Sequence, residues 1–261
     1  MGNEQLMVHF HPEERVFVDR ALEWIKRAAE HHEVRLTDFL DPRQVFILQT
    51  LVNRHPDVQV RVDGGYAGAE RQRACIAPDY VYLDAEPMNI EVLDIESPDR
   101  KWLELEHGDF MGAMLGLGIK RDKIGDIHVA DDGCHVLVTD DISSFLDTHL
   151  QQVHRVPVTT VILPLAKLRP VAVTLKPMQL SVASMRLDGI ASDVYRLSRT
   201  KIVIPIKAGR CKVNWRVEED PSTQLRSGDV VSLKGFGRFK VLEEEGITKK
   251  GRVRVTVGVY V

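Results

Sequence analysis

The sequence predicts an α+β protein of three consecutive units, over residues 1–80, 81–180 and 181–261. Two observations on pattern and one on charge lead to this fold class. Hydrophobic residues switch between helical and strand spacing through the first two units. Prolines at positions 157, 164, 170 and 177 then indicate bends or edge strands before the last unit. Residues 181–261 carry a net charge of +7, whereas residues 1–180 carry −10.

The first unit is expected to contain two helices and two strands. Apolar residues recur at helical spacing over residues 12–34. Asp41 before a proline is a typical helix start, and the helix that it begins runs through residue 51. Alternating valines predict a strand over residues 58–62, and a double glycine supplies the turn to a return strand over residues 73–77.

The second unit has the pattern of a split βαβ fold, which ferredoxin-like and RNA-recognition domains share. Many functions occur on this fold, so the architecture alone assigns none. RNA recognition by such a sheet uses exposed aromatic and basic residues on its central strands, but Ile127, Val129, Val136 and Val138 stand there, so we do not expect base stacking. The predicted elements are strands at 89–95, 125–130, 134–139 and 158–163 and helices at 107–117 and 140–152, with a turn at Asp131–Asp132–Gly133.

Composition and length describe a globular chain. With 261 residues, 44% hydrophobic and 28% charged, it is long enough for two or three cores and too apolar for wholesale disorder. Its apolar runs stay below the roughly 18 residues that span a bilayer, and its first residues lack the apolar core of a signal peptide. Cys75, Cys134 and Cys211 have neither metal nor disulfide spacing and are expected to be buried thiols. We therefore expect a cytoplasmic protein that does not contact a membrane.

An ordered set of motifs lies in the third unit. Arg186–Leu187–Asp188 opens a short helix, and Ser198–Arg199 starts a second one. Residues 207–214 (KAGRCKVN) lead into a strand, and residues 225–231 (LRSGDVV) follow. This set resembles the RNA-binding domain named after ribosomal small-subunit protein four, hereafter the S-four-type domain. The resemblance implies an α+β RNA-binding domain over residues 181–261.

The residues of this motif also have a physical reason to bind phosphate. Ser198 is a favourable N-cap, and the free amides of a helix N-terminus attract anions. Arg199 follows it with a planar guanidinium that suits phosphate, whereas Asp188 is expected to be a structural hydrogen-bond partner. The basic charge of the unit is typical of a module that approaches a polyanion, although clustered solvated charges explain it equally well. The predicted RNA-contacting residues are Arg186, Ser198, Arg199, Lys201, Lys207, Arg210, Lys212, Asn214, Lys234 and Arg238.

Two segments of the third unit depart from the S-four-type pattern. Residues 202–206 (IVIPI) have the propensity of a strand, yet the pattern places them in the second helix, which is then kinked or short and ends at a left-handed Gly209. Trp215 stands where most such domains have glycine, and either base stacking or a hydrophobic plug against the sheet fits it. A hairpin tip with further cations follows, at Lys249–Lys250, Arg252 and Arg254. These side chains either extend the basic surface or form the solvent-exposed face of an antiparallel sheet.

A sequence block in the second unit resembles the signature of one particular protein family. Residues 107–127 (HGDFMGAMLGLGIKRDKIGDI) are similar to the central signature of the YlmH family, as are residues 64–71 and 213–215 to other blocks of it. The resemblance covers almost the whole chain. Gly108, Gly112 and Gly116 fall every fourth residue, and we expect the smooth helix face that they form to serve core packing. Three cations that follow fit either a second basic contact or a solvated loop: Lys120, Arg121 and Lys123.

No motif of the chain indicates catalysis. A phosphate-binding glycine loop, a Walker sequence and a G-x-S-x-G elbow are all missing from the sequence. His9, His11, His31 and His32 lack the further ligands that would complete a metal site. Asp131–Asp132 and Asp140–Asp141 are better explained as a turn and a helix cap. We expect no catalytic residue, cofactor, metal or obligate small molecule.

The YlmH resemblance implies a ribosome-associated protein that binds structured RNA without catalysis. Its expected partners are ribosomal RNA, tRNA or both, on the large subunit, because relatives are linked to the rescue of stalled large subunits that hold peptidyl-tRNA. Two alternatives stay open. One is an RNA-modifying enzyme with its site in residues 1–160, and the other is a division-associated scaffold whose basic face contacts protein or membrane.

Overall fold

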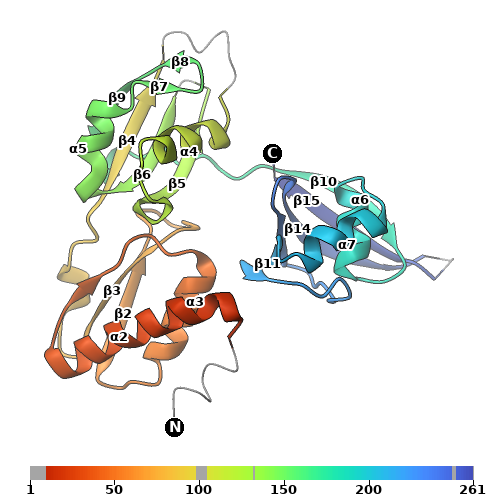
Figure 1. The fold of residues 1–261 in the computed structure, drawn as a ribbon, viewed down its shortest axis with the longest axis horizontal. Helices are drawn as coiled ribbons and strands as arrows, with labels where there is room; N and C mark the ends of the chain where they lie inside the picture. The colour runs from red at the N-terminus through yellow and green to blue at the C-terminus, as the bar shows by residue number, and fades with distance from the viewer. Residues whose placement is uncertain (1–9, 98–104, 132, 249–250, 261) are drawn as a thin grey trace. The chain divides into compact units, whose positions relative to one another are not determined.

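The chain folds as two compact units, residues 1–171 and 172–261, each with its own core (Figure 1). The computed structural model describes residues 10–97, 105–131, 133–248 and 251–260. The second unit starts before residue 181, where the prolines and the charge had suggested a boundary. Its first strand, β10 (Leu175–Val182), pairs along its whole length with the last strand, β15 (Val253–Tyr260).

The first part of unit 1 packs two helices against a three-stranded antiparallel sheet of order β1-β3-β2. Asp41 caps the second helix as predicted, because its carboxylate accepts from the Gln44 amide while the Gln44 side chain accepts from the Asp41 amide. Val18, Ile25 and Leu48 are buried between the helices and the sheet. The elements are η1 (Pro12–Glu14), α2 (Arg15–His31), β1 (Arg35–Leu36), α3 (Pro42–Val52), β2 (Val58–Asp63) and β3 (Arg73–Pro78).

The second part of unit 1 has the predicted split βαβ fold. Its antiparallel sheet has the order β5-β6-β4-β9, and α4 and α5 cover one face of it, where Phe110, Met114 and Leu146 are buried (Figure 1). The helix expected over residues 140–152 ends at His149, and Thr139 rather than Asp140 is its N-cap. Asp132, part of the expected turn, lies outside the described residues. The elements are η2 (Leu83–Ala85), β4 (Ile90–Glu96), α4 (His107–Gly116), η4 (Arg121–Lys123), β5 (Ile124–Val129), β6 (Cys134–Thr139), α5 (Asp140–His149), β7 (Gln152–Val153), β8 (Val156–Pro157), β9 (Thr159–Leu163) and η5 (Leu165–Lys167).

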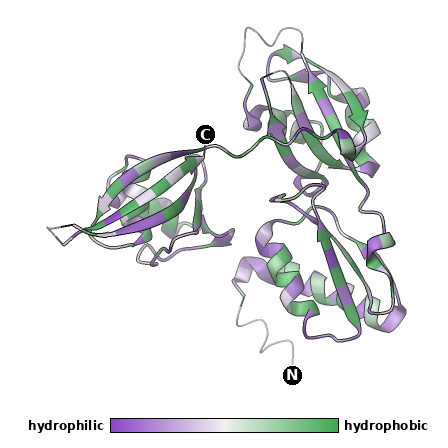
Figure 2. Ribbon diagram, turned by 180° about the vertical axis from the view of Figure 1, so that it is seen from behind, coloured by the Kyte–Doolittle hydropathy of each residue, from purple (hydrophilic) through white to green (hydrophobic). Residues whose placement is uncertain are grey.

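Unit 2 is a six-stranded antiparallel sheet of order β10-β15-β14-β13-β11-β12 with both helices on one face (Figure 1). Hydrophobic and hydrophilic residues alternate along its strands, as Figure 2 shows, because one face packs on the helices. Ile190 of α6 and Ile202 of α7 are buried against Val231, Phe239 and Val257. The further elements are α6 (Leu187–Val194), α7 (Arg199–Lys207), β11 (Cys211–Val213), β12 (Arg216–Val217), β13 (Val230–Leu233) and β14 (Gly237–Ile247).

Residues 202–206 are helical despite their strand propensity. Ile202 and Ile206 are both fully buried, and their spacing places them on one face of α7. Burial of this apolar face outweighs the small helix-propensity penalty of β-branched residues, about 0.5 kcal/mol each. Pro205 lies within the last turn of the helix, and Gly209 follows in the left-handed conformation with φ 67°, as expected. The helix is therefore short, with nine residues.

Candidate nucleic-acid interface

The N-terminus of α7 has the predicted serine cap. The Ser198 hydroxyl caps the helix by accepting from the Lys201 amide at 3.3 Å. Ser198, Arg199 and Lys201 are all exposed, so solvent or a ligand reaches the first turn of the helix. Free amides and two cations there together favour a phosphate group.

Arg199 lies against α6 because residue 189 is a glycine. A Cβ atom at Gly189 would stand only 2.9 Å from Nη2 of Arg199, so any side chain there would displace the guanidinium. The positive charge of Arg199 also helps to lower the pKa of Asp188. Sequence reasoning missed Gly189, although a glycine in the first turn of a short helix is a signal that could have found it.

Asp188 has the structural role that the sequence suggested. Arg186 donates from Nε and Nη2 to its two carboxylate oxygens, each at 3.0 Å. These bonds are the largest cause of the lowered pKa of Asp188, and they also raise the pKa of Arg186. The pair fixes the start of α6, and much of the Arg186 donor fork is already used within the protein.

The sheet divides the predicted RNA-contacting residues between its two faces. Lys212, Ser232 and Arg238 are directly opposite one another across β11, β13 and β14. Their strand neighbours are buried under the helices, so these three side chains lie on the helix-free face. There the Arg238 guanidinium stacks 4.7 Å from the ring centre of Tyr260. One surface therefore does not contain all ten residues.

Asn214 is exposed, and its side chain makes hydrogen bonds within the fold. Its Nδ2 donates to Asp229 at 2.8 Å, and its Oδ1 accepts from the Val230 amide at 2.9 Å. Asn214 and Trp215 form the two-residue turn between β11 and β12, with φ values of 50° and 63°. Trp215 thus adopts a conformation that favours glycine, and it is half-buried.

The remaining predicted residues lie around the ends of the elements. Lys207 is the last residue of α7, and Arg210 follows it just before β11. The Lys234 amide donates to the Arg210 carbonyl at 3.1 Å, which brings these two exposed residues together. Lys249 and Lys250 lie outside the described residues, and Arg252 donates to Ser181.

In unit 1, residues from other segments cover the helix-free face of the central sheet. Val92 and Leu137 of this face pack with Phe39, Tyr66 and Leu168. The segment after η5 is also hydrogen-bonded to the sheet, since the Arg169 amide donates to His135 Nδ1 at 3.1 Å and the Val171 amide to His128 Nδ1 at 3.2 Å. Sheets of RNA-recognition domains stack bases on this face. Here the chain's own residues occupy it.

The glycine face of α4 does not serve core packing, so that expectation was wrong. A Cβ atom at Gly108, Gly112 or Gly116 would meet nothing within 4 Å among the described residues. Phe110 and Met114 form the buried face of the helix instead. The three glycines do lie on one face of α4, but their spacing alone does not indicate whether that face is buried or exposed.

Lys123 is a bridge within unit 1 and not an open cation. Its Nζ lies 2.8 Å from a carboxylate oxygen of Asp38 and 2.6 Å from one of Asp141. These bonds raise the pKa of Lys123, whose burial acts in the opposite direction, and they lower the pKa of Asp141. Two readings, a second basic contact or a solvated loop, were open for Lys120, Arg121 and Lys123, and neither describes Lys123.

The described residues hold no group of three or more His, Cys, Asp or Glu side chains that could bind a metal ion, and His9 lies outside them. Cys75, Cys134 and Cys211 are buried, as expected. Within the same described ranges, no helix has the length and apolarity to cross a membrane.

Comparison with known proteins adds four findings. Residues 13–81 match the family model described as "YlmH, N-terminal", and residues 84–167 match "Putative RNA-binding domain in YlmH". The chain is 37% identical to ribosome-associated protein quality control protein P2 of Bacillus subtilis (strain 168), over 95% of this chain and 96% of that protein. Its fold is similar to the cell division protein ylmH from Streptococcus pneumoniae, with a TM-score of 0.53 and 24% identity over 61% of this chain and 96% of that one.

The second family model covers a part of the chain from which the sequence analysis expected no base stacking. We predicted RNA contacts at residues 181–261, whereas the matched RNA-binding model spans residues 84–167. The local sequence offered little signal, because the central strands lack exposed aromatic residues and the region is acidic.

Proposed function

This chain belongs to the YlmH family, and from that premise we propose that it is a ribosome-associated protein that binds structured RNA without catalysis. The N-terminus of α7 carries the proposal, because Ser198 caps it and Gly189 leaves room for Arg199 beside it. The name of the Bacillus subtilis relative, a ribosome-associated quality control protein, supports the ribosome as the site of action. A cytoplasmic location follows from that partner.

Unit 2 supplies the phosphate contacts in this proposal. Residues 172–261 contain 17 Lys and Arg against 9 Asp and Glu, so the unit attracts a polyanion from a distance. Arg199 and Lys201 bind phosphate at the helix N-terminus, and Lys207, Arg210 and Lys234 extend the contact along exposed element ends. Asn214 contributes by holding the turn, and Arg186 by holding Asp188.

The central part of unit 1 recognises RNA in a different way. Residues 84–167 contain only 7 Lys and Arg against 16 Asp and Glu, so backbone phosphates do not draw this region to RNA. Its sheet face is covered, which leaves helix ends and loops to meet the folded shape of a large RNA. We infer that ribosomal RNA of the large subunit beside a bound tRNA is the partner, because phosphate contacts carry no sequence and shape must supply specificity.

Gradient sedimentation of cell lysate tests the proposal. The protein should travel with large ribosomal subunits at low salt and leave them at high salt, because exposed phosphate contacts are screened. A variant without residues 172–261 should stay at the top of the gradient. If the full-length protein stays at the top at low salt, with ribosomes intact, the ribosomal function is wrong and the scaffold alternative gains support.

A further inference from the structure

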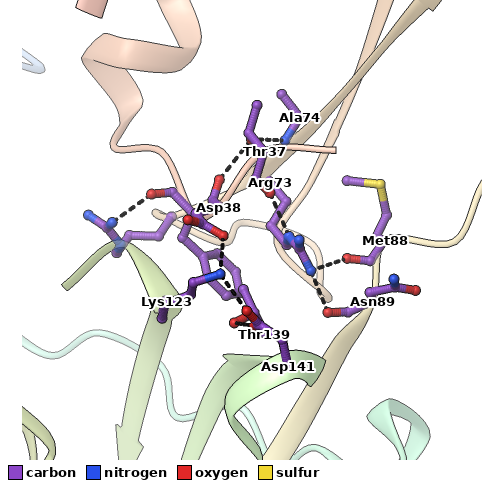
Figure 3. Close-up of polar contacts among 11 residues, drawn as sticks. Thr37, Asp38, Arg73, Ala74, Met88, Asn89, Lys123, Thr139 and Asp141 are labelled. Carbon is purple, nitrogen blue, oxygen red and sulfur yellow. Dashed lines mark hydrogen bonds and ion pairs between the residues drawn. The ribbon is translucent and has the colours of Figure 1, made fainter. Parts of the chain in front are cut away.

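A cleft of about 570 Å³ opens between the two parts of unit 1, and no feature of the proposed function uses it. Residues of α2, β1 and β3 line one wall, and residues from η4 and the start of α5 line the other. Its volume lies within the range of sites for small molecules and cofactors, roughly 300–1,000 Å³. Figure 3 shows polar contacts beside the cleft, among them those of Lys123 that join the two parts.

Arg73 lines the cleft, and one of its donor groups has no partner among the described residues. It is only 6% exposed, and its Nε and Nη1 donate to the carbonyls of Thr37, Met88 and Asn89 (Figure 3). Its Nη2 makes no hydrogen bond to the residues that the structure describes. A buried guanidinium with a spare N–H group lining a cleft is suited to an acceptor atom of a ligand.

The opposite wall has a hydrogen-bond acceptor that also lacks a partner among the described residues. Asp122 lines the cleft, and its Oδ1 is buried without a hydrogen-bond partner among the described residues. Lys123 beside it already bridges Asp38 and Asp141, so it does not satisfy this oxygen. A ligand that supplies hydroxyl or amino donors at this wall would satisfy it.

The rim combines two open cations with an aromatic side chain. Arg20 and Arg35 line the cleft, are exposed, and form no ion pair or hydrogen bond within the described ranges. Trp24 lies one helical turn after Arg20 and is half-buried, held edge-on by Phe17 at a ring-centre distance of 6.0 Å. Two guanidinium groups beside an indole ring favour an anion attached to a flat ring.

We propose that this cleft binds one nucleoside phosphate unit. The phosphate lies against Arg20 and Arg35, and the base contacts Trp24. The ribose hydroxyls or a base amino group donate to Asp122, while Arg73 donates to an acceptor of the same unit. The choice of a nucleotide over other ringed anions rests on the proposed RNA-binding function. The unit comes either from an unpaired nucleotide of bound RNA or from a free nucleotide.

Calorimetric titration of the full-length protein with AMP, and separately with an unpaired hexa-adenylate RNA, tests the site. Arg20→Ala combined with Arg35→Ala should weaken AMP binding at least about tenfold, because charge-assisted hydrogen bonds are lost. Trp24→Leu should weaken it by a similar or smaller factor. Arg15→Ala is the matched control, since Arg15 is exposed on the same helix and does not line the cleft. Thermal unfolding of each variant checks that it is folded.

Comparing AMP with hexa-adenylate shows whether the bound unit is a free nucleotide or a nucleotide of bound RNA. If hexa-adenylate binding falls with the double substitution while AMP binds more than tenfold more weakly than the RNA, the occupant is an unpaired RNA nucleotide. If AMP binds as tightly as the RNA, the occupant is a free nucleotide. The inference is overturned if the folded double variant binds both ligands as the natural protein does, or if the natural protein binds neither ligand. Ribosome sedimentation of the same variants keeps this result separate from the proposed function.

Discussion

The central sheet and the C-terminal sheet are built alike and differ in what lies on the face without helices. Each packs two helices on one side. On the other side the central sheet is covered by Phe39, Tyr66 and Leu168, whereas the C-terminal sheet presents Lys212 and Arg238. The same layer arrangement thus gives an open polar face in one sheet and a face covered by the chain itself in the other.

The two regions also differ in net charge. The central region is acidic and the C-terminal unit is basic, although the family model that names RNA binding matches the central region. The fold alone therefore does not say which part grips the RNA backbone. From the exposure and charge of its side chains we propose that unit 2 has that role, and each prediction below tests one side of this contrast.

The largest effect is expected from charge reversal at Arg199. Arg199→Glu should weaken RNA binding by about 1.5–3 kcal/mol or more, because it removes a charge-assisted hydrogen bond and adds repulsion. Filter binding or calorimetry with ribosomal RNA measures the change. Lys176→Glu makes the same change in charge at an exposed position of the edge strand β10 and should cost much less. Equal losses in both variants would mean that net charge, not the α7 site, governs binding.

Gly189→Ala should weaken RNA binding by about 1 kcal/mol, because the new methyl group displaces the Arg199 guanidinium. Alanine is the better helix former by about 1 kcal/mol, so the thermal stability of the variant should not fall. RNA binding would thus fall while thermal stability would not. A variant that binds RNA as tightly as the natural protein would show that the position of Arg199 against α6 does not matter.

Gly112→Ala makes the corresponding change in the central region. Its Cβ atom would meet nothing within 4 Å among the described residues, so α4 should gain about 0.5–1 kcal/mol of stability. Denaturant unfolding measures the gain. RNA binding should stay unchanged if only unit 2 grips the backbone, and a loss of RNA binding would mean that the glycine face of α4 lies against the RNA.

A smaller, pH-dependent effect is expected at the covered sheet face. Burial is the main cause that lowers the pKa of His128, and His135 adds to it while Asp126 opposes it. Neutral His128 therefore stabilises unit 1 above the unfolded pKa of about 6.5, and this contribution is lost as pH falls below that value. His128→Gln should reduce the fall in unfolding free energy between pH 7 and pH 5. An identical pH profile in the variant would assign the effect to another group.

The sequence was sufficient for the order of the longer helices and strands of unit 1 and for the helix caps at Asp41 and Ser198, because these depend on local spacing and local hydrogen bonds. It missed the two-residue strand β1, so the first sheet has three strands and not the two expected. At residues 202–206 propensity favours a strand, but the family pattern correctly placed a short helix there, because burial of two isoleucines outweighs propensity. The sequence also could not foresee that Asn214 is used within a turn or that Gly112 faces solvent, because both depend on how distant segments pack. The cleft in unit 1 had no local signal for the same reason, since Arg20, Arg73 and Asp122 come from separate elements.

The most direct test of the central claim is the salt dependence of RNA affinity for two separate fragments, residues 1–171 and residues 172–261. We expect the C-terminal fragment to keep most of the affinity, with a slope of roughly −2 to −3.5 in log affinity against log salt concentration. This slope corresponds to three to five phosphate contacts on unpaired RNA, at about −0.7 per contact. The N-terminal fragment should bind weakly and with little salt dependence. A folded N-terminal fragment that carries the full affinity and the full slope would contradict the account.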